Sequence, residues 1–289
     1  GLNTGGNALT IANTTASVTS GTSTIRFIGG ATTNVIRNCS IQGSFSASAA
    51  TNGGNIFFST DALTANGNDN NTITGCDIGP AGTNLPTKGV YSNGSTTTAA
   101  INNSGILIDN NNIFNCFGAA VTSGAVYIAG GSTEINVTNN RIYQTATRTQ
   151  TTGAQHSGIW ISNSSSGNNF QITGNIIGYA SNTQTGTYTF VGLASSSFIP
   201  VFLSVGTTTA SSVQGNTIAG IAMSGALAGT SSSGPFRGVY VSSGLAYIGA
   251  TSAGASGTGN TIGSMGATDS ITFTSSSTSA AEILGMYNF

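Results

Sequence analysis

The residues able to do acid/base chemistry in this sequence are few and widely spaced. Hydrolysis or elimination on a polysaccharide needs carboxylates, with or without a further base, grouped on one face. The seven acids are Asp61, Asp69, Asp77, Asp109, Glu134, Asp269 and Glu282. Asp61 and Asp69 could approach one another within one loop, which we interpret as solvated. The spacing supplies no acid/base pair, so the sequence predicts no catalytic residues.

Metal ligands and nucleophiles are equally sparse. The triplet Asp69-Asn70-Asn71 could offer oxygen ligands to Ca²⁺, but it lacks the ligand count of a recognised calcium loop. His156 is the only histidine and has no nucleophile motif around it, so we expect it on the surface. We therefore expect neither a metal nor a cofactor.

The three cysteines form no disulfide framework or metal-binding spacing. Cys39 and Cys76 occupy equivalent positions in successive copies of a repeat described below, which would bring their Cα atoms within disulfide range. Side chains in register point alike, so two stacked buried thiols are the alternative to a strained bond. Cys116 has no equivalent partner.

The composition limits the classes of partner that this chain could bind. Only 13 of the 289 residues are charged (6 basic and 7 acidic), the formal net charge is −1, and 42 residues are glycine. Scattered single charges create no field for nucleic acid or anionic lipid. No run approaches the roughly 20 apolar residues of a membrane span. We therefore expect no nucleic-acid partner and no membrane insertion.

One seven-residue motif recurs seven times. Its seventh position is always Ile, its fourth is always Asn or Gly, and its second is aliphatic in six copies. Asn and Gly tolerate positive φ, so each copy predicts a short strand, a left-handed kink and another strand. The fifth position predicts an inward ladder of Asn and Cys that hydrogen-bonds the backbone of the bends. That ladder consists of Cys39, Cys76, Asn111, Asn140, Asn175, Asn216 and Asn260.

A second motif, an aliphatic residue followed by an aromatic one, falls between these copies. Alternation along a strand points the aliphatic residue inward and the aromatic residue outward. Arg26 starts this outward series, and the aromatic row that follows is Phe57, Tyr91, Tyr127, Trp160, Phe202, Tyr240 and Tyr287. The row is covered by long loops as a satellite core, or it is exposed and suited to stacking on sugars or docking a partner.

Three short strands in each period of about 38 residues, with no amphipathic helix pattern, predict an all-β fold. We expect a right-handed parallel β-helix, a solenoid of about seven to eight coils with long loops, spanning residues 1–289 as a single domain. A β-sandwich would need turns every 8 to 12 residues and would not repeat Asn and Ile at one register. The ends carry no cap motif, so we expect further β-helix in a longer chain or head-to-tail stacking of Gly1 after Phe289.

The stretches Ser23–Ile28, Asn70–Pro80 and Gly167–Asn175 resemble the repeats of parallel β-helix proteins. More narrowly, they resemble those of the large Ser/Thr/Asn/Gly-rich surface proteins that Bacteroidota export by type IX secretion. The resemblance implies an extracellular or cell-surface protein, a segment of an adhesin or of a filament. We therefore expect a non-enzymatic structural or adhesive module that associates with itself and contacts surface glycans. The alternatives are a carbohydrate-binding module and a β-helix polysaccharide lyase or glycoside hydrolase.

Overall fold

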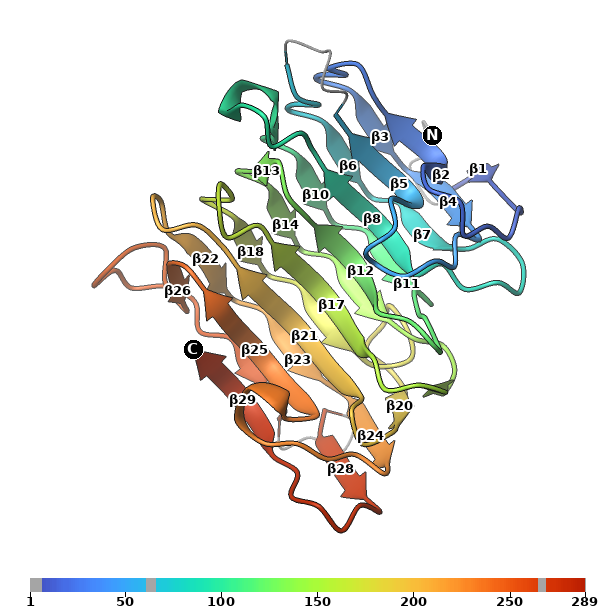
Figure 1. Ribbon diagram of the computed structural model, residues 1–289, viewed down its shortest axis with the longest axis vertical. Coiled ribbons are helices and arrows are strands. Elements are labelled where there is room, and N and C mark those ends of the chain that lie inside the picture. The colour runs from blue at the N-terminus through green and yellow to red at the C-terminus, as the bar shows by residue number, and fades with distance from the viewer. Residues whose placement is uncertain (1–6, 61–65, 265–268, 289) are drawn as a thin grey trace.

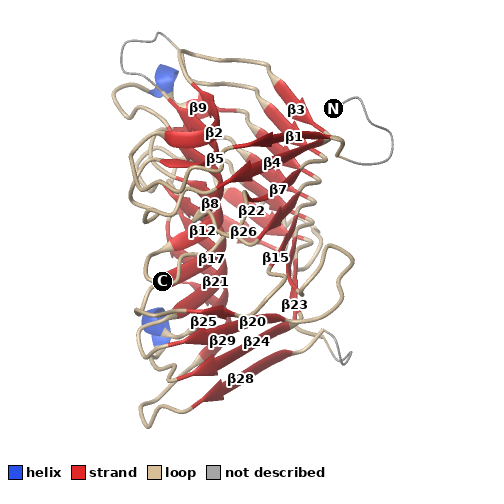
Figure 2. Cartoon of the chain, turned by 90° about the vertical axis from the view of Figure 1, so that its right-hand side faces the viewer, coloured by secondary structure: helices blue, strands red, loops and turns tan. Residues whose placement is uncertain are grey.

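The chain winds into a column of parallel strands. The computed structural model describes residues 7–60, 66–264 and 269–288. Within these ranges no α-helix forms, and the strands gather into three long sheets of eight, seven and eight strands. Figures 1 and 2 show the strands stacked along the column, with β1 to β3 near one end and β28 and β29 near the other. The expected parallel β-helix is confirmed.

Each coil contributes one strand to each long sheet, except that sheet II has seven described strands and the other two have eight. Sheet I contains β1 (Leu9–Ala12), β4 (Cys39–Gly43), β7 (Asp77–Pro80), β11 (Asn112–Phe114), β15 (Arg141–Tyr143), β19 (Ile176–Gly178), β23 (Thr217–Ala219) and β27 (Thr261–Ile262). Sheet II contains β3 (Val35–Arg37), β6 (Thr72–Thr74), β10 (Leu107–Asp109), β14 (Asn136–Thr138), β18 (Gln171–Thr173), β22 (Ser211–Gln214) and β26 (Ala246–Ile248). Sheet III contains β2 (Thr22–Phe27), β5 (Gly53–Ser59), β8 (Lys88–Asn93), β12 (Ser123–Ile128), β17 (Gln155–Ser162), β21 (Ser197–Ser204), β25 (Phe236–Ser243) and β29 (Ile283–Asn288).

The kink motif joins sheet II to sheet I. Its fourth residue has a positive φ in the first six copies, for example 52° at Asn38 and 69° at Gly174. This left-handed residue turns the chain from β3 into β4, and likewise in each later coil. Every motif Ile lies in one register of sheet I, as Ile142 opposite Ile113 and Ile177 illustrate, and both neighbours are fully buried.

The seventh copy is the exception, and its expected first strand is wrong. The sixth copy spans Ser212–Ile218 and the seventh spans Ser256–Ile262, so the repeat predicts pairing of Ser256–Thr258 with Ser212–Gln214. Instead, β26 (Ala246–Ile248) takes that place, with Ile248 opposite Val213. The chain then makes a loop before Thr258 rejoins the column, where its carbonyl accepts a hydrogen bond from the Gly215 amide. Ile248 supplies the aliphatic side chain that Gly257 lacks, which explains the exchange.

The long segments between sheets I and III are more ordered than expected. Four of their strands form a further parallel sheet, sheet IV, in the C-terminal half of the column: β16 (Arg148–Thr149), β20 (Tyr188–Gly192), β24 (Ile221–Gly225) and β28 (Ile271–Ser275). Figure 2 shows β20, β24 and β28 crossing the lower part of the column. Sheet IV widens the interior there, and Phe190, Phe198 and Phe236 fill it.

The remaining elements are short. They are the strand pair β9 (Asn103–Ser104) and β13 (Ser132–Thr133), and the 3₁₀ turns η1 (Ala99–Ile101) and η2 (Ser231–Ser233). One continuous apolar cluster runs through the interior from Phe27 to Val239. Its inward positions are the aliphatic residues that both motifs predict.

Candidate functional site

The aromatic row follows the outer face of sheet III. Strand pairing places its seven members opposite one another in a single register, as Tyr91 between Phe57 and Tyr127 shows. Ring centroids lie 5.0 Å apart for Phe57 and Tyr91, 5.2 Å for Tyr91 and Tyr127, and 4.4 Å for Tyr127 and Trp160, all stacked. The rings therefore turn their faces to each other along the column.

The C-terminal part of the row changes geometry. Trp160 and Phe202 meet edge to face at 5.9 Å, Phe202 and Tyr240 do so at 5.2 Å, and Tyr287 is tilted on Tyr240 at 5.4 Å. Cationic side chains lie against the row at two places. The Arg26 guanidinium lies 5.3 Å from the Phe57 ring, and that of Arg237 lies 4.7 Å from the Tyr240 ring. The row is one unbroken chain of ring contacts.

Loops cover the row unevenly. Phe57 and Tyr91 are buried and, with Ala129 and Tyr127, form an apolar cluster separate from the main core. Tyr240 is also buried, whereas Trp160, Phe202 and Tyr287 remain partly exposed. Each of the two sequence alternatives therefore describes part of the row.

At the N-terminal end of the aromatic row, a lysine holds the covering segment, residues 44–52, in place. Lys88 is fully buried, and its ammonium donates to the backbone carbonyls of Ala49 (3.1 Å) and Thr51 (2.5 Å). The same ammonium lies 4.2 Å from the ring centroid of Tyr91 and 5.0 Å from that of Phe45. Burial lowers the pKa of Lys88 to about 7. Lys88 thus ties residues 44–52 over the row, a role that the sequence did not indicate.

The predicted ladder runs through the bends between sheets II and I. The Oδ1 atom of Asn140 accepts from the backbone and side-chain nitrogens of Asn111, both at 3.0 Å. Its Nδ2 donates to the Ile108 carbonyl at 2.9 Å. The same pattern links Asn140 to Asn175, Asn175 to Asn216 and Asn216 to Asn260. Each Asn therefore bridges the coil before it and the coil after it.

The two cysteines take the place of Asn at the start of the ladder. Cys39, Cys76 and Cys116 are all buried, and none of them forms a disulfide. The backbone amide of Cys76 still donates to Asn111 Oδ1 at 2.9 Å, while its Sγ contacts the Thr74 carbonyl at 3.4 Å. Burial raises the pKa of Cys76, and it raises that of Cys116 to about 12. The structure favours stacked thiols over a disulfide.

The expectation of a surface His156 is wrong. It lies at the start of β17, 1% exposed, beneath the widened part of the core. Nδ1 lies 2.8 Å from Ser123 Oγ and Nε2 lies 2.5 Å from the Tyr188 hydroxyl, while Phe198 stacks on the ring at 5.4 Å. The sequence could not show this, because β20 and its Tyr188 belong to sheet IV, which has no repeat signature.

Three of the described acids, Asp69, Asp77 and Asp109, join successive coils. Asp69 Oδ1 accepts from the Ser104 amide at 2.8 Å, Asp77 Oδ1 from Asn112 Nδ2 at 2.7 Å, and Asp109 Oδ1 from Thr138 Oγ1 at 2.7 Å. Each of these bonds reaches from one coil to the next. Asp61, the expected neighbour of Asp69 in a loop, lies outside the described residues.

The Asp69-Asn70-Asn71 triplet is also engaged within the fold. Asn71 is fully buried, its Oδ1 accepts from the Asn34 amide at 2.9 Å, and its Nδ2 donates to the Ala31 carbonyl at 2.8 Å. In the part of the chain that the structure describes, no three His, Cys, Asp or Glu side chains gather as a metal site would require. No helix among the described residues has the length and apolarity to cross a membrane.

Comparison with protein-family models, with curated proteins and with solved structures found no match for this chain.

Proposed function

We propose that this chain is a non-enzymatic structural or adhesive module of an extracellular, cell-surface or filamentous protein. The observation that carries the proposal is the use of its reactive side chains as links between coils. Carboxylates and amides that could do chemistry are instead hydrogen-bonded from coil to coil, as Asp109 is to Thr138 and Asn140 is to Asn175.

The surface composition supports an extracellular place. Most of the polar surface is hydroxyl and amide, and the net charge is −1. The repeats resemble those of surface proteins exported by type IX secretion, and this resemblance supports a location on or outside the cell surface. A neutral rod built from a repeated unit suits a spacer or an adhesive stalk, since its length follows from the number of coils.

Glycan binding along the aromatic row is the alternative, and the ring geometry disfavours it for most of the row. Sugars stack on the faces of aromatic rings. Both faces of Tyr91 and Tyr127 are already covered by neighbouring rings. At Phe202, which is partly exposed and meets both neighbours edge to face, the row is not closed by face-to-face stacking.

Two experiments test the proposal. The 289-residue chain is incubated with a panel of polysaccharides and assayed for reducing ends and unsaturated products, and we expect none. Turnover that disappears on a single Asp→Asn change would contradict a non-enzymatic role. Antibodies against the chain should label intact, unpermeabilised cells of the source, whereas labelling only after permeabilisation would contradict a surface location.

A further inference from the structure

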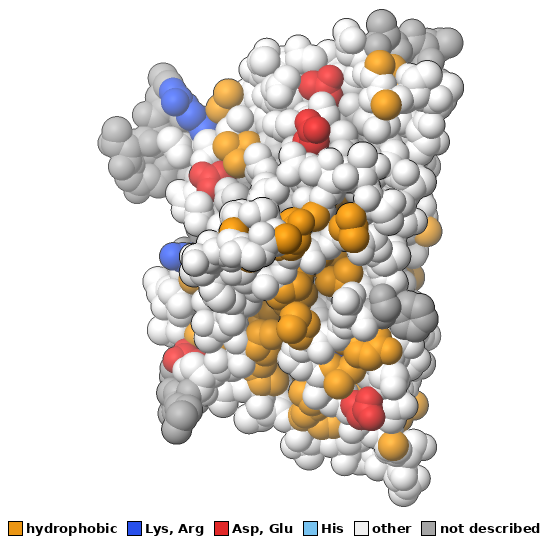
Figure 3. Space-filling view, turned by 90° about the vertical axis from the view of Figure 1, so that its left-hand side faces the viewer, with side chains coloured by type: hydrophobic (Ala, Val, Ile, Leu, Met, Phe, Trp, Pro, Cys, Tyr) orange, Lys and Arg blue, Asp and Glu red, His pale blue; other side chains and the backbone are white. Residues whose placement is uncertain are grey.

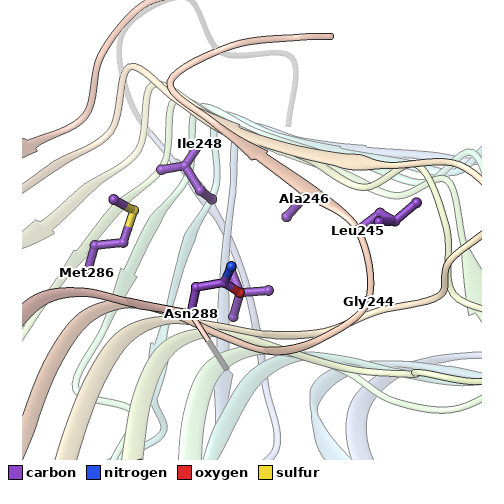
Figure 4. A pocket seen from close by; sticks show the side chains of 7 residues that line it. Gly244, Leu245, Ala246, Ile248, Met286 and Asn288 are labelled. Carbon is purple, nitrogen blue, oxygen red and sulfur yellow. The ribbon is translucent and has the colours of Figure 1, made fainter. Parts of the chain in front are cut away.

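The only histidine of the chain is covered by a short polar segment. His156 is 1% exposed, and the face of the molecule in Figure 3 shows no histidine at its surface. The hollow between β26 and β29, which Figure 4 shows with Ile248 and Met286, is lined by none of the residues that contact His156. Water can reach the buried imidazole only if the segment above it moves.

That segment is residues 144–150, which contain β16, an edge strand of sheet IV. Gln144 and Gln150 are its buried side chains, and the residues between them are exposed or half-buried. Strand β16 pairs with β20 at two positions only. The Nε2 atom of Gln150 is buried and has no hydrogen-bond partner among the described residues. The cover over His156 is therefore thin, and few interactions hold it in place.

A chain of hydrogen bonds joins this cover to the imidazole. The Nε atom of Arg148 donates to Gln144 Oε1 at 2.6 Å, and its Nη2 donates to Asn115 Oδ1 at 2.6 Å. Gln144 in turn hydrogen-bonds the Tyr188 hydroxyl, which lies 2.5 Å from Nε2 of His156. A change of charge on the imidazole therefore acts directly on the residues of the cover.

The surroundings of His156 disfavour a second positive charge. The titratable and charged side chains of the cluster are Arg148 from β16, Tyr188 from β20 and Cys116 from the segment after β11. The facing strands β12 and β21 contribute Ser123 and Phe198, which are uncharged. No carboxylate is among these described neighbours. An imidazolium formed here would lie buried near the Arg148 guanidinium without a counter-charge, which is costly.

We propose that residues 144–150 form an acid-released latch, in which protonation of His156 detaches β16 from β20 and admits water to the cluster while the three long sheets stay paired. Arg148 is half-buried in the closed latch, so a short movement of the segment brings its guanidinium into solvent. In the open latch both cations are hydrated, and water and salt screen their repulsion. At neutral pH the imidazole is uncharged, and the closed arrangement is restored.

The direction of the pH response follows from the two states of the latch. Burial, with Arg148 as a second cause, holds the pKa of His156 at about 3 in the closed latch, whereas its ordinary value is 6.5. The open latch therefore binds a proton below pH 6.5 that the closed latch refuses down to about pH 3. Within this range, opening becomes about tenfold more favourable for each pH unit of acidification. The amides of the Asn ladder do not titrate, so the long sheets stay paired.

The test is amide hydrogen exchange of the 289-residue chain at pH 6.5 and pH 4.5, resolved by residue and corrected for the intrinsic effect of pH on exchange. The Gln150 amide donates to the Val191 carbonyl at 2.9 Å, across the gap that would open. The Asn140 amide donates to Asn175 Oδ1 at 3.0 Å in the ladder and is the control. We expect protection of Gln150 to fall about fiftyfold and that of Asn140 by less than about threefold. Unchanged protection at Gln150, or equal losses at both amides, would overturn the inference.

A variant separates the imidazole from other effects of acid. His156→Gln keeps a side chain that hydrogen-bonds hydroxyl groups but does not titrate, so protection of Gln150 should be the same at both pH values. A loss as large as that of the wild type would count against the latch. The wild type gives an independent measurement, because its single imidazole can be followed by NMR. That imidazole should take up its proton over the pH range in which Gln150 loses protection. Protonation near pH 6.5 with Gln150 still protected would overturn the latch, whether or not the variant folds.

Discussion

The Nε2 atom of His156 and the hydroxyl oxygen of Tyr188 lie 2.5 Å apart inside the widened core. Ser123 Oγ lies 2.8 Å from Nδ1 on the other side of the ring. A neutral imidazole donates at one nitrogen and accepts at the other, so two hydroxyl groups satisfy it. Burial, with Arg148 as a second cause, lowers the pKa of His156 from 6.5 to about 3.

This pKa predicts acid sensitivity. Below pH 6.5 the unfolded chain takes up a proton on His156 that the folded chain refuses, so stability is complete above pH 6.5 and falls between pH 6.5 and 3. The loss from this residue approaches about 4 kcal/mol at pH 3, at about 1.36 kcal/mol per pKa unit. Urea unfolding from pH 7 to 3.5 should show a steeper loss for the wild type than for His156→Phe. Parallel curves for the two proteins would contradict the prediction.

The ladder predicts that substitution of Asn175 lowers the free energy of unfolding substantially. Asn175→Leu removes the acceptor of the Asn140 amide and the donor to the Val137 carbonyl, leaving both buried. We expect destabilisation by roughly 1 to 3 kcal/mol. The exposed Thr207→Leu is the control and should change the free energy of unfolding little. Equal denaturation midpoints for the two variants would argue against a stabilising ladder.

Lys88→Met should loosen the cover of the aromatic row. Met matches the length of Lys but donates no hydrogen bonds to the carbonyls of Ala49 and Thr51. We expect faster hydrogen exchange at the Ala49 amide, which bonds to the Thr122 carbonyl at 3.0 Å. Arg141→Met removes a positive charge from another coil and should leave that amide protected. Unchanged exchange in Lys88→Met would show that apolar packing alone holds residues 44–52.

The thiols should be unreactive in the folded protein. All three cysteines are buried, and burial raises the pKa of Cys76 and Cys116. Thiolate is the reactive form, so an aromatic disulfide reagent at pH 8 should label none of them natively and all three in denaturant. Labelling of only Cys116 in denaturant, without reductant, would reveal a bond between Cys39 and Cys76.

The sequence by itself determined the repeating part of this protein. In a parallel coil each side chain contacts its own equivalent in the coils on either side, so a residue type that suits one coil suits all of them. This is why the positions of Asn140, Ile142 and Trp160 could be assigned to ladder, core and outer row from spacing alone.

Only the tertiary structure determined the conformation of segments that have no counterpart in the other coils. His156 is buried because Tyr188 and Phe198 arrive from separate segments, and Lys88 is buried because residues 44–52 fold back over it. Likewise, Ala246–Ile248 pairs with β22 in place of Ser256–Thr258, because Ile248 fills the core where Gly257 could not. Such contacts join segments of unequal length and unlike sequence, and no repeat spacing records them.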